Sequence, residues 1–419
     1  MSKFTKPLTY FAEYANDRID IDSVSLDTFV TTDNLLQNKL GLEAAINLPP
    51  QKGKIPAFKE KDILVGNIRP YLKKIWFADR DGGCSADVLT FRVKEKHEPL
   101  FVYYGLFRDD FFNHMMRGSK GTKMPRGDKS QILDFVLPNF EKNIQAKIAT
   151  VLSTLDKKIA LNNRINTELE AMAKTLYDYW FVQFDFPISE AQANALGKPE
   201  LKGKPYKSSG GKMVFNEALK REIPEGWGVD EIVNVIPVKD GTHDSPKPKE
   251  EGYHLITSKN LKKEGLDFEN ANLISEEDYI NINMRSQVNT GDILFSMIGS
   301  IGTVYKVDDE NINFAIKNVA LYKTSNKTDM MNFVYMYLRS YDMQCYMGNV
   351  IAGSIQKFIG LGSLRSMPIL LEEGVISSFE EKTKDLFKQM TLIKQENQQL
   401  TQLRDWLLPM LMNGQVTVK

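Results

Sequence analysis

The sequence of this chain repeats itself, and this repeat restricts the possible folds more than any other feature. The tripeptide DIL at 62–64 recurs at 292–294, and FVY at 101–103 recurs at 333–335. Further matches follow the same order along the chain: TTDNL with TSKNL, DVLTF with NVALY, and Pro138 with Pro368. An ordered series of matches at a near-constant offset is typical of two copies of one structural unit. The sequence therefore predicts two related globular halves.

Each half is followed by a segment whose apolar residues have the spacing of a coiled coil. They recur at steps of four and three in the first segment and seven apart in the second. The predicted seam consists of Leu152, Leu155, Ile159, Asn162, Asn166, Leu169, Leu176, Leu386, Ile393, Asn397, Leu400 and Leu407. Polar residues in a seam lower stability but fix the register, so the two segments are expected to pair in a defined way.

The alternative for these segments is that each helix packs only on its own globular half. A helix over residues 143–181 would be about 58 Å long at 1.5 Å per residue, longer than a small domain needs. This length favours pairing between the helices. Pro187 is expected to end the first helix, and Pro409 falls near the end of the second.

The two halves combine strand and helix patterns, so the predicted fold class is α+β: two β-rich globular domains with helices, separated by the two long helices. KDILVGNI and GDILFSMI are short β-rich runs, whereas the stretches beginning FVYYGLF and FVYMYLR favour helices. Gly, Pro and Ser residues between the halves favour a linker over a core element. The expected boundaries are 1–142 and 223–373 for the globular domains, 143–187 and 374–412 for the helices, 188–222 for the linker and 413–419 for a tail.

Charge is balanced over the whole chain but not along it. The 54 Lys and Arg residues equal the 54 Asp and Glu residues, which argues against a histone-like basic coat. Basic residues gather between 51 and 80 and between 114 and 131, in Gly-, Pro- and Ser-containing loops that can approach phosphates and bases. An ordinary solvated lysine surface is the alternative. The candidate DNA-binding residues of the first half are Arg69, Tyr71, Lys73, Lys74, Lys120, Thr122, Lys123 and Arg126.

The second half has equivalent loops with fewer charges: DGTHDSPKPK, MIGSIGTV and AGSIQK. Hydroxyl and amide side chains can read bases without adding net charge. His243 has no surrounding cluster of Cys, His or carboxylates with metal-site spacing, so no metal is expected. The candidate DNA-binding residues here are Thr242, His243, Lys247, Ser300, Ser354, Gln356 and Lys357.

The sequence contains no complete catalytic motif. FIGLG at 358–362 fits the FxGxG pattern of S-adenosylmethionine-binding methyltransferases, but it lacks the strand-loop-helix setting and a downstream [N/D]PP[Y/F]. Walker A, HExxH and nucleophile-elbow motifs are also missing, and Cys84 and Cys345 form no CxxC pair. The chain is therefore expected to be non-catalytic. A signal-peptide h-region and a long apolar run are missing too, so a cytoplasmic protein without a membrane segment is expected.

Several motifs occur in order over nearly the whole chain: the paired DIL strands, LYDYWF, the linker SSGGKMVFNEALKREIPEGW that ends in IPEGW at 223–227, KDGTHDSP and LRDWLLPMLMNGQV. Their order resembles that in the specificity subunit of type I restriction-modification systems. In one respect the chain departs from the pattern. Its first half lacks a PxGW opening, so the resemblance leaves the fold of residues 1–30 open.

The resemblance implies two target-recognition domains held apart by an antiparallel helix pair, with a pseudo-twofold internal repeat. Each domain would read one half of a bipartite, asymmetric site in double-stranded DNA, with the helices as a ruler. Two methyltransferase subunits that bind S-adenosylmethionine and methylate adenine would dock on the chain, and motor-nuclease subunits would join for restriction. The chain itself would hold no cofactor, since its partners would supply the pocket for a flipped base.

Two other functions are compatible with the sequence. A DNA methyltransferase or nuclease with a built-in recognition domain would need a complete cofactor or metal motif. A protein-binding coiled-coil scaffold would not need the basic loops for DNA. Substituting Lys73, Lys74, Lys123 and Arg126 would then leave DNA affinity and its salt dependence unchanged.

Overall fold

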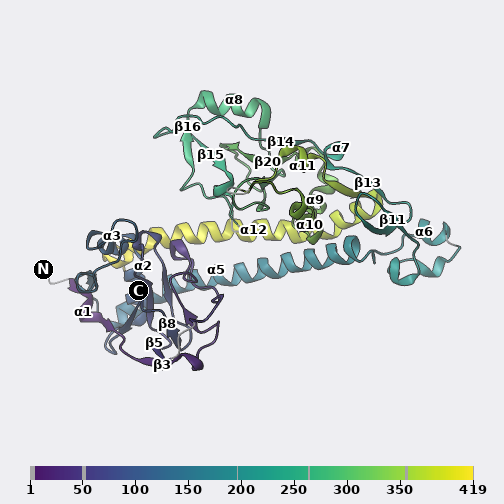
Figure 1. The fold of residues 1–419 in the computed structure, drawn as a ribbon. Coiled ribbons are helices and arrows are strands. Elements are labelled where there is room, and N and C mark those ends of the chain that lie inside the picture. The colour runs from purple at the N-terminus through teal and green to yellow at the C-terminus, as the bar shows by residue number, and fades with distance from the viewer. Residues whose placement is uncertain (1–4, 50–52, 196, 263–264, 354–356, 419) are drawn as a thin grey trace. The chain divides into compact units, whose positions relative to one another are not determined.

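The computed structural model describes residues 5–49, 53–195, 197–262, 265–353 and 357–418, which fold into two compact units. Unit 1 comprises Met1–Asn163 with Gln395–Lys419, and unit 2 comprises Arg164–Lys394. Each unit contains one globular half of the sequence and a part of both long helices, α5 (Lys142–Tyr177) and α12 (Glu373–Met412) (Figure 1). The mixture of helices and sheets confirms the predicted α+β class.

The described residues of unit 1 form two four-stranded sheets and one short strand pair. The strands are β1 (Thr5–Pro7), β2 (Ala12–Tyr14), β3 (Arg18–Asp20), β4 (Phe29–Val30), β5 (Lys54–Phe58), β6 (Ile63–Gly66), β7 (Ile75–Phe77), β8 (Gly82–Cys84), β9 (Val88–Val93) and β10 (Val136–Pro138). The first sheet has the order β2-β9-β6-β7 and is antiparallel. The second has the order β3-β5-β8-β4, in which β4 runs parallel to β8. The pair β1-β10 is antiparallel.

The core of unit 1 lies between the first sheet, four helices and the long helices. The four helices are α1 (Leu8–Phe11), α2 (Pro99–Phe107), α3 (Asp109–Arg117) and α4 (Lys129–Ile132). Phe101 and Phe111 are fully buried with Phe91 of the sheet, Leu152 of α5 and Leu411 of α12. The predicted helical stretch beginning FVYYGLF is confirmed as α2 and α3.

Unit 2 repeats this arrangement. Its strands are β11 (Met213–Asn216), β12 (Arg221–Pro224), β13 (Gly228–Glu231), β14 (Val238–Asp240), β15 (Tyr253–Thr257), β16 (Asn272–Ile274), β17 (Ile293–Ser296), β18 (Val304–Lys306), β19 (Phe314–Lys317), β20 (Val319–Tyr322) and β21 (Pro368–Leu371). The first sheet of unit 2 has the order β14-β20-β17-β18, which matches the first sheet of unit 1. Its second sheet has the order β16-β15-β19, in which β15 runs parallel to β19 as β4 does to β8. The helices are α6 (Glu190–Ala195), α7 (Ile232–Val235), α8 (Glu276–Ser286), α9 (Met331–Leu338), α10 (Tyr341–Val350) and α11 (Leu361–Arg365).

The repeat extends to individual hydrogen bonds. In unit 1, Asn34 Oδ1 accepts from the backbone N of Thr31 at 2.6 Å. In unit 2, Asn260 Oδ1 accepts from the backbone N of Thr257 at 3.0 Å. A side-chain amide that binds the backbone three residues earlier stabilises a local turn. The matched TTDNL and TSKNL sequences therefore encode the same turn.

The beginning of unit 1 follows the same plan as unit 2, although its sequence lacks PxGW. The succession β1, α1, β2 corresponds to β13, α7, β14, and in each unit the first strand pairs with the strand that precedes a long helix, β10 or β21. The fold of residues 5–30, which the sequence left open, is therefore that of a second copy.

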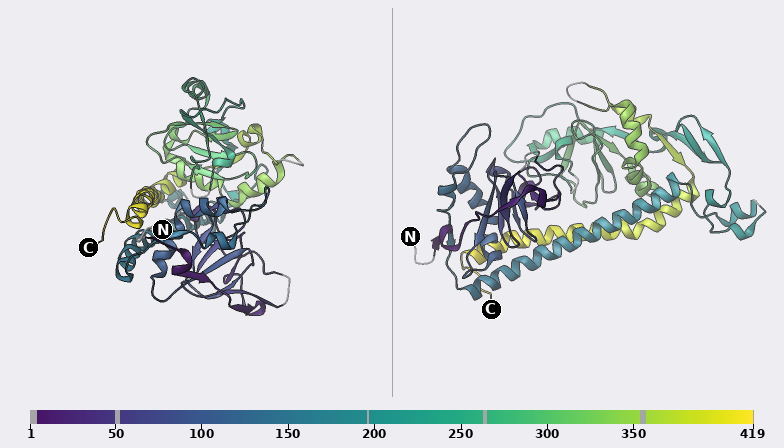
Figure 2. Two further views of the ribbon diagram at one scale, coloured as in Figure 1. Left: turned by 90° about the vertical axis from the view of Figure 1, so that its left-hand side faces the viewer. Right: turned by 60° about the horizontal axis from the view of Figure 1, so that its bottom comes forward.

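In each unit, the part of α5 lies beside the part of α12 in an antiparallel pair (Figure 1 and Figure 2). Asp156 of unit 1 binds Arg404 at 2.9 Å, and the Nδ2 of Asn166 in unit 2 lies 3.5 Å from the carbonyl of Met390. All the predicted seam residues are buried or half-buried. The predicted coiled coil is confirmed, and Pro409 lies near the end of α12, as expected.

One segment differs from the sequence-based expectation. The segment at 188–222 was expected to be a linker outside the core, yet Tyr206 stacks on Phe186 with ring centroids 4.8 Å apart, and Ala193 is buried. Aromatic burial outweighs the Gly- and Pro-rich composition here.

Candidate nucleic-acid interface

In unit 1, the two basic loops predicted from the sequence lie against each other. The loop after β6 contacts the loop after α3 through a β-bridge between Ile68 and Arg126, and the backbone N of Arg69 donates to the carbonyl of Pro125 at 2.8 Å. Lys120 and Arg126 exchange two backbone hydrogen bonds, at 2.9 and 3.0 Å. The residues of both loops thus form one surface, called here the basic loop surface.

Two cations of the basic loop surface form only weak, exposed ion pairs with neighbouring carboxylates. Arg126 lies 3.0 Å from Asp87, and Lys120 lies 3.2 Å from Asp128. Their side chains are 58% and 85% exposed. Ion pairs as exposed as these contribute at most about 1 kcal/mol, so a phosphate can compete for the cations. Further exposed residues on the same loops are Tyr71, Thr122 and Lys123.

Two adjacent predicted lysines have different surroundings. Lys73 is half-buried and binds Asp109 at 3.0 Å. Lys74 is buried, and its Nζ donates to the backbone carbonyl of Thr32. Desolvation lowers the pKa of the Lys74 ammonium, against an opposing effect of Asp33. The structure therefore places Lys74 inside unit 1 and not on the loop surface where the sequence predicted it, because its side chain satisfies a backbone carbonyl.

The equivalent loops of unit 2 pair in the same way. Ile298 and Ala352 both form β-bridges with Phe358, and the backbone N of Ile359 donates to the carbonyl of Met297 at 2.9 Å. These bridges correspond to those that Ile68 and Lys120 form with Arg126 in unit 1. The two units therefore present the same loop pair.

The loop pair of unit 2 differs in chemistry from the basic loop surface. Phe358, which is 45% exposed, occupies the bridge position of Arg126. Ser300 and Lys357 are exposed on these loops, as predicted. Ser354 and Gln356, which were also predicted, lie outside the described residues. Among the described residues of these two loops, Lys357 is the one that carries a charge.

A polar network holds His243 beside these loops. Its Nε2 lies 2.8 Å from Oδ2 of Asp240, and its Nδ1 lies 2.7 Å from Oδ1 of Asn318. Arg285 binds the other oxygen of Asp240 at 2.6 Å. The hydroxyl of Ser258 accepts from the backbone N at position 297 and donates to the carbonyl of Asn318, which connects His243 to the loop after β17.

The remaining predicted residues lie on the loop 241–249. The backbone N of Thr242 donates to the carbonyl of Ile316 at 3.0 Å, so Thr242 extends the second sheet. Lys247 lines a hollow over that sheet.

The sequence did not identify Asp240 and Arg285, which orient His243. The available signal was the aspartate that directly precedes GTHDSP.

The FIGLG segment does not form a cofactor loop. Gly360 is the N-cap of α11, a five-residue helix, and no βαβ unit surrounds it in the part of the chain that the structure describes. The described residues also contain no group of three or more His, Cys, Asp or Glu side chains arranged to hold a metal ion. No helix among them is long and apolar enough to cross a membrane.

Comparisons with known proteins agree with the sequence motifs. Residues 21–171 match the family model of the type I restriction modification DNA specificity domain. The specificity subunit of type I restriction enzyme HindI from Haemophilus influenzae is 24% identical over 450 residues, covering 95% of this chain and 96% of the relative. The MjaIX specificity subunit from Methanocaldococcus jannaschii is 24% identical over 328 residues, covering 76% of this chain and 69% of the relative.

The fold has a counterpart among solved structures. The S subunit of a type I restriction-modification system from M. genitalium superposes with a TM-score of 0.53 and 15% identity, covering 98% of this chain and 97% of that one. The predicted resemblance to specificity subunits of type I restriction-modification systems is confirmed. Residues 21–171 are therefore similar to the type I restriction modification DNA specificity domain, and the chain as a whole is similar to the specificity subunits of these systems.

Proposed function

We propose that this chain selects the DNA sequence for a type I restriction-modification complex by reading one half of a bipartite, asymmetric site with each unit. The observation that carries this proposal is the same loop pair in both units with different side chains, Arg126 in one and Phe358 in the other. Base edges differ in their donors, acceptors and methyl groups. Two loop pairs with the same backbone arrangement but different side chains are therefore suited to two different half-sites.

The catalytic partners follow from the same proposal. Two methyltransferase subunits would dock on the chain, bind S-adenosylmethionine and methylate adenine, and motor-nuclease subunits would join for restriction. The chain would contribute recognition of double-stranded DNA in the cytoplasm, and its partners would supply the pocket for a flipped base.

The test is to exchange residues 1–140 for the recognition domain of another specificity subunit and to sequence the methylome of cells that carry the chimaera with the methyltransferase. Only one half of the methylated site should change. A single continuous site, or a change in both halves, would contradict the two-reader model. If the purified chain alone methylates or cleaves DNA, the enzymatic alternative is correct.

The ruler role of the helices has its own test. Deleting two heptads from residues 148–180, with a matching deletion in 386–407, removes about 21 Å of helix at 1.5 Å per residue. This corresponds to about six base pairs at 3.4 Å each, so the unspecified spacer should shorten or binding should be abolished. A spacer of unchanged length would refute the ruler.

A further inference from the structure

One face of the second sheet in unit 2 forms a hollow of about 430 Å³. Strand register determines which side chains it contains: Asn272 lies opposite Leu255, and Lys317 lies opposite Thr257. Neighbours in register point to the same face of a sheet. Ile282 of α8 packs with Leu255 and covers part of this face. The uncovered part is the hollow, and the loop 245–248 forms its rim.

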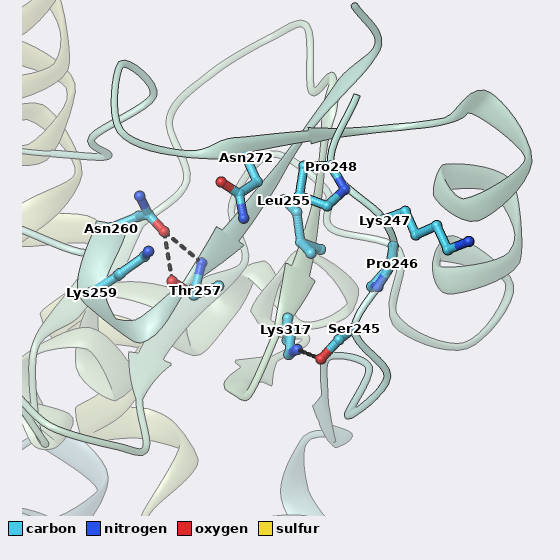
Figure 3. Close-up of a pocket in the computed structure, with 10 residues that line it drawn as sticks. All are labelled: Ser245, Pro246, Lys247, Pro248, Leu255, Thr257, Lys259, Asn260, Asn272 and Lys317. Carbon is cyan, nitrogen blue, oxygen red and sulfur yellow. Dashed lines mark hydrogen bonds between the residues drawn. The ribbon is translucent and has the colours of Figure 1, made fainter. Parts of the chain in front are cut away.

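The charge of this hollow is positive and unbalanced. Lys247, Lys259 and Lys317 line it, and its lining includes no carboxylate. Figure 3 shows the ammonium of Lys259 directed toward Thr257 and that of Lys317 bound to the hydroxyl of Ser245, whereas Lys247 points away. Within the described residues, none of the three lysines takes part in a salt bridge. Two ammonium groups and the amide of Asn272 therefore offer hydrogen-bond donors without a counter-ion.

Unit 1 has a hollow in the equivalent place but without this charge. It lies beside the turn of Thr31 and Asn34, as the hollow of unit 2 lies beside the turn of Thr257 and Asn260. Its charged lining residues are two basic and two acidic side chains, Arg18, Lys54, Asp33 and Glu43. A hollow beside this turn is thus present in both units, whereas the net positive charge of its lining is found in unit 2 and not in unit 1.

We propose that the hollow of unit 2 binds a phosphate of the DNA backbone through Lys259 and Lys317. This proposal rests on the proposed function, since it names a DNA contact of the same recognition unit. Lysine binds phosphate as a point charge and does not need the planar geometry of arginine. Lys317 also holds Ser245 of the loop that carries Thr242 and His243. A phosphate bound there fixes the position of the reading loop without sequence preference of its own.

The test compares the full-length chain with its K259A/K317A double variant for binding to a DNA duplex over a series of salt concentrations. Affinity decreases with salt, so the slope of log affinity against log salt is negative. Its magnitude should decrease by about 0.9 for each phosphate that the lysines no longer neutralise. The reduction in affinity should be equal for cognate and unrelated sequences. Lys317→Arg should retain the wild-type slope, and circular dichroism verifies that each variant is folded. The matched control, R18A/K54A in the balanced hollow of unit 1, should leave the slope unchanged.

The outcomes separate this proposal from the proposed function. If K259A/K317A keeps the wild-type slope while K123A/R126A weakens binding, the hollow is not a phosphate site, but the chain still reads DNA. An equal fall in slope for R18A/K54A would show general electrostatics and overturn the assignment. If the wild-type chain binds no DNA, the proposed function fails. A titration with inorganic phosphate that the lysine variant abolishes would then assign the hollow to a free anion instead.

Discussion

The side-chain Nδ2 of Asn162 donates a hydrogen bond to Oδ1 of Asn397 at 2.9 Å, which joins the helix that follows the first half to the helix that follows the second. Asn162 is almost fully buried, and the same Nδ2 lies 2.8 Å from Oε2 of Glu396. A buried amide in an apolar seam keeps its hydrogen bond only if the partner amide lies directly opposite it on the other helix. This contact therefore fixes the register of α5 and α12 in unit 1.

Replacing Asn162 with leucine is expected to destabilise unit 1 by about 1 kcal/mol, because the half-buried Asn397 side chain then has one hydrogen-bond partner fewer. The N162L/N397L double variant should regain this stability, since an apolar layer needs no hydrogen bond. Chemical denaturation followed by circular dichroism measures both. Lys157→Ala, on the exposed face of α5, is the control. A single variant as stable as this control would show that the amide pair does not fix the register.

The sequence predicted the strand and helix pattern and the seam because these depend on local periodicity. It predicted the repeat because matching motifs recur in the same order at a near-constant offset. The DIL motif shows why this worked. Its aspartate is buried in both units, and it pairs with a cation at the end of the neighbouring strand, Arg92 in one and Lys323 in the other. The aspartate and its cation therefore occupy equivalent positions in the two halves of the sequence.

The candidate site was only partly predictable, since loop composition does not reveal which side chains turn inward. Lys73 and Lys74 are neighbours in one basic loop, yet Lys74 binds the carbonyl of Thr32, 42 positions away. The bridge between Ile68 and Arg126 likewise joins distant segments. Contacts of this kind depend on the tertiary fold, and a basic loop by itself does not encode them.

The buried ion pair of unit 2 should be sensitive to removal of its cation. Asp292 is fully buried and the Lys323 side chain is 7% exposed, so Lys323→Met leaves an unpaired carboxylate inside the sheet. This should cost about 3–5 kcal/mol, and the D292N/K323M pair should recover part of it. Hydrogen exchange of peptides covering β17 and β20 measures the effect. Arg92→Met in unit 1 is the comparison, with a smaller destabilisation expected because Arg92 is 30% exposed. Equal destabilisation would contradict this argument.

Lys74 and Lys123 should respond differently to substitution. Lys74→Met leaves the carbonyl of Thr32 without its donor and should lower the stability of unit 1 by about 1–3 kcal/mol. Lys123→Ala removes an exposed cation of the basic loop surface. It should leave the stability unchanged and reduce the salt slope of DNA binding by about 0.9 if Lys123 neutralises one phosphate. Thermal unfolding measures the stability of both variants, and binding to a DNA duplex over a series of salt concentrations measures their salt slopes. The reverse pattern would place Lys74, and not Lys123, at the DNA.

Glu380 on α12 should make unit 2 less stable as the pH rises. Its Oε1 accepts from the backbone N of Phe333 at 2.7 Å, and burial raises the pKa of its carboxyl to about 7. The folded chain therefore keeps a proton that the unfolded chain releases above its ordinary pKa. The resulting decrease in stability begins near this ordinary pKa, grows until about pH 7 and then levels off, with a total of roughly 1–3 kcal/mol.

The Glu380→Gln variant keeps an acceptor for Phe333 but has no charge to bury. Its denaturation midpoint should therefore vary less with pH between about 5 and 8 than that of the wild type, and the two should differ most at the upper end. Glu381→Gln changes the exposed neighbour on the same helix and should follow the wild-type profile. If Glu380→Gln lowers stability equally at all these pH values, the carboxyl is charged in the folded chain and its burial does not control the pH dependence.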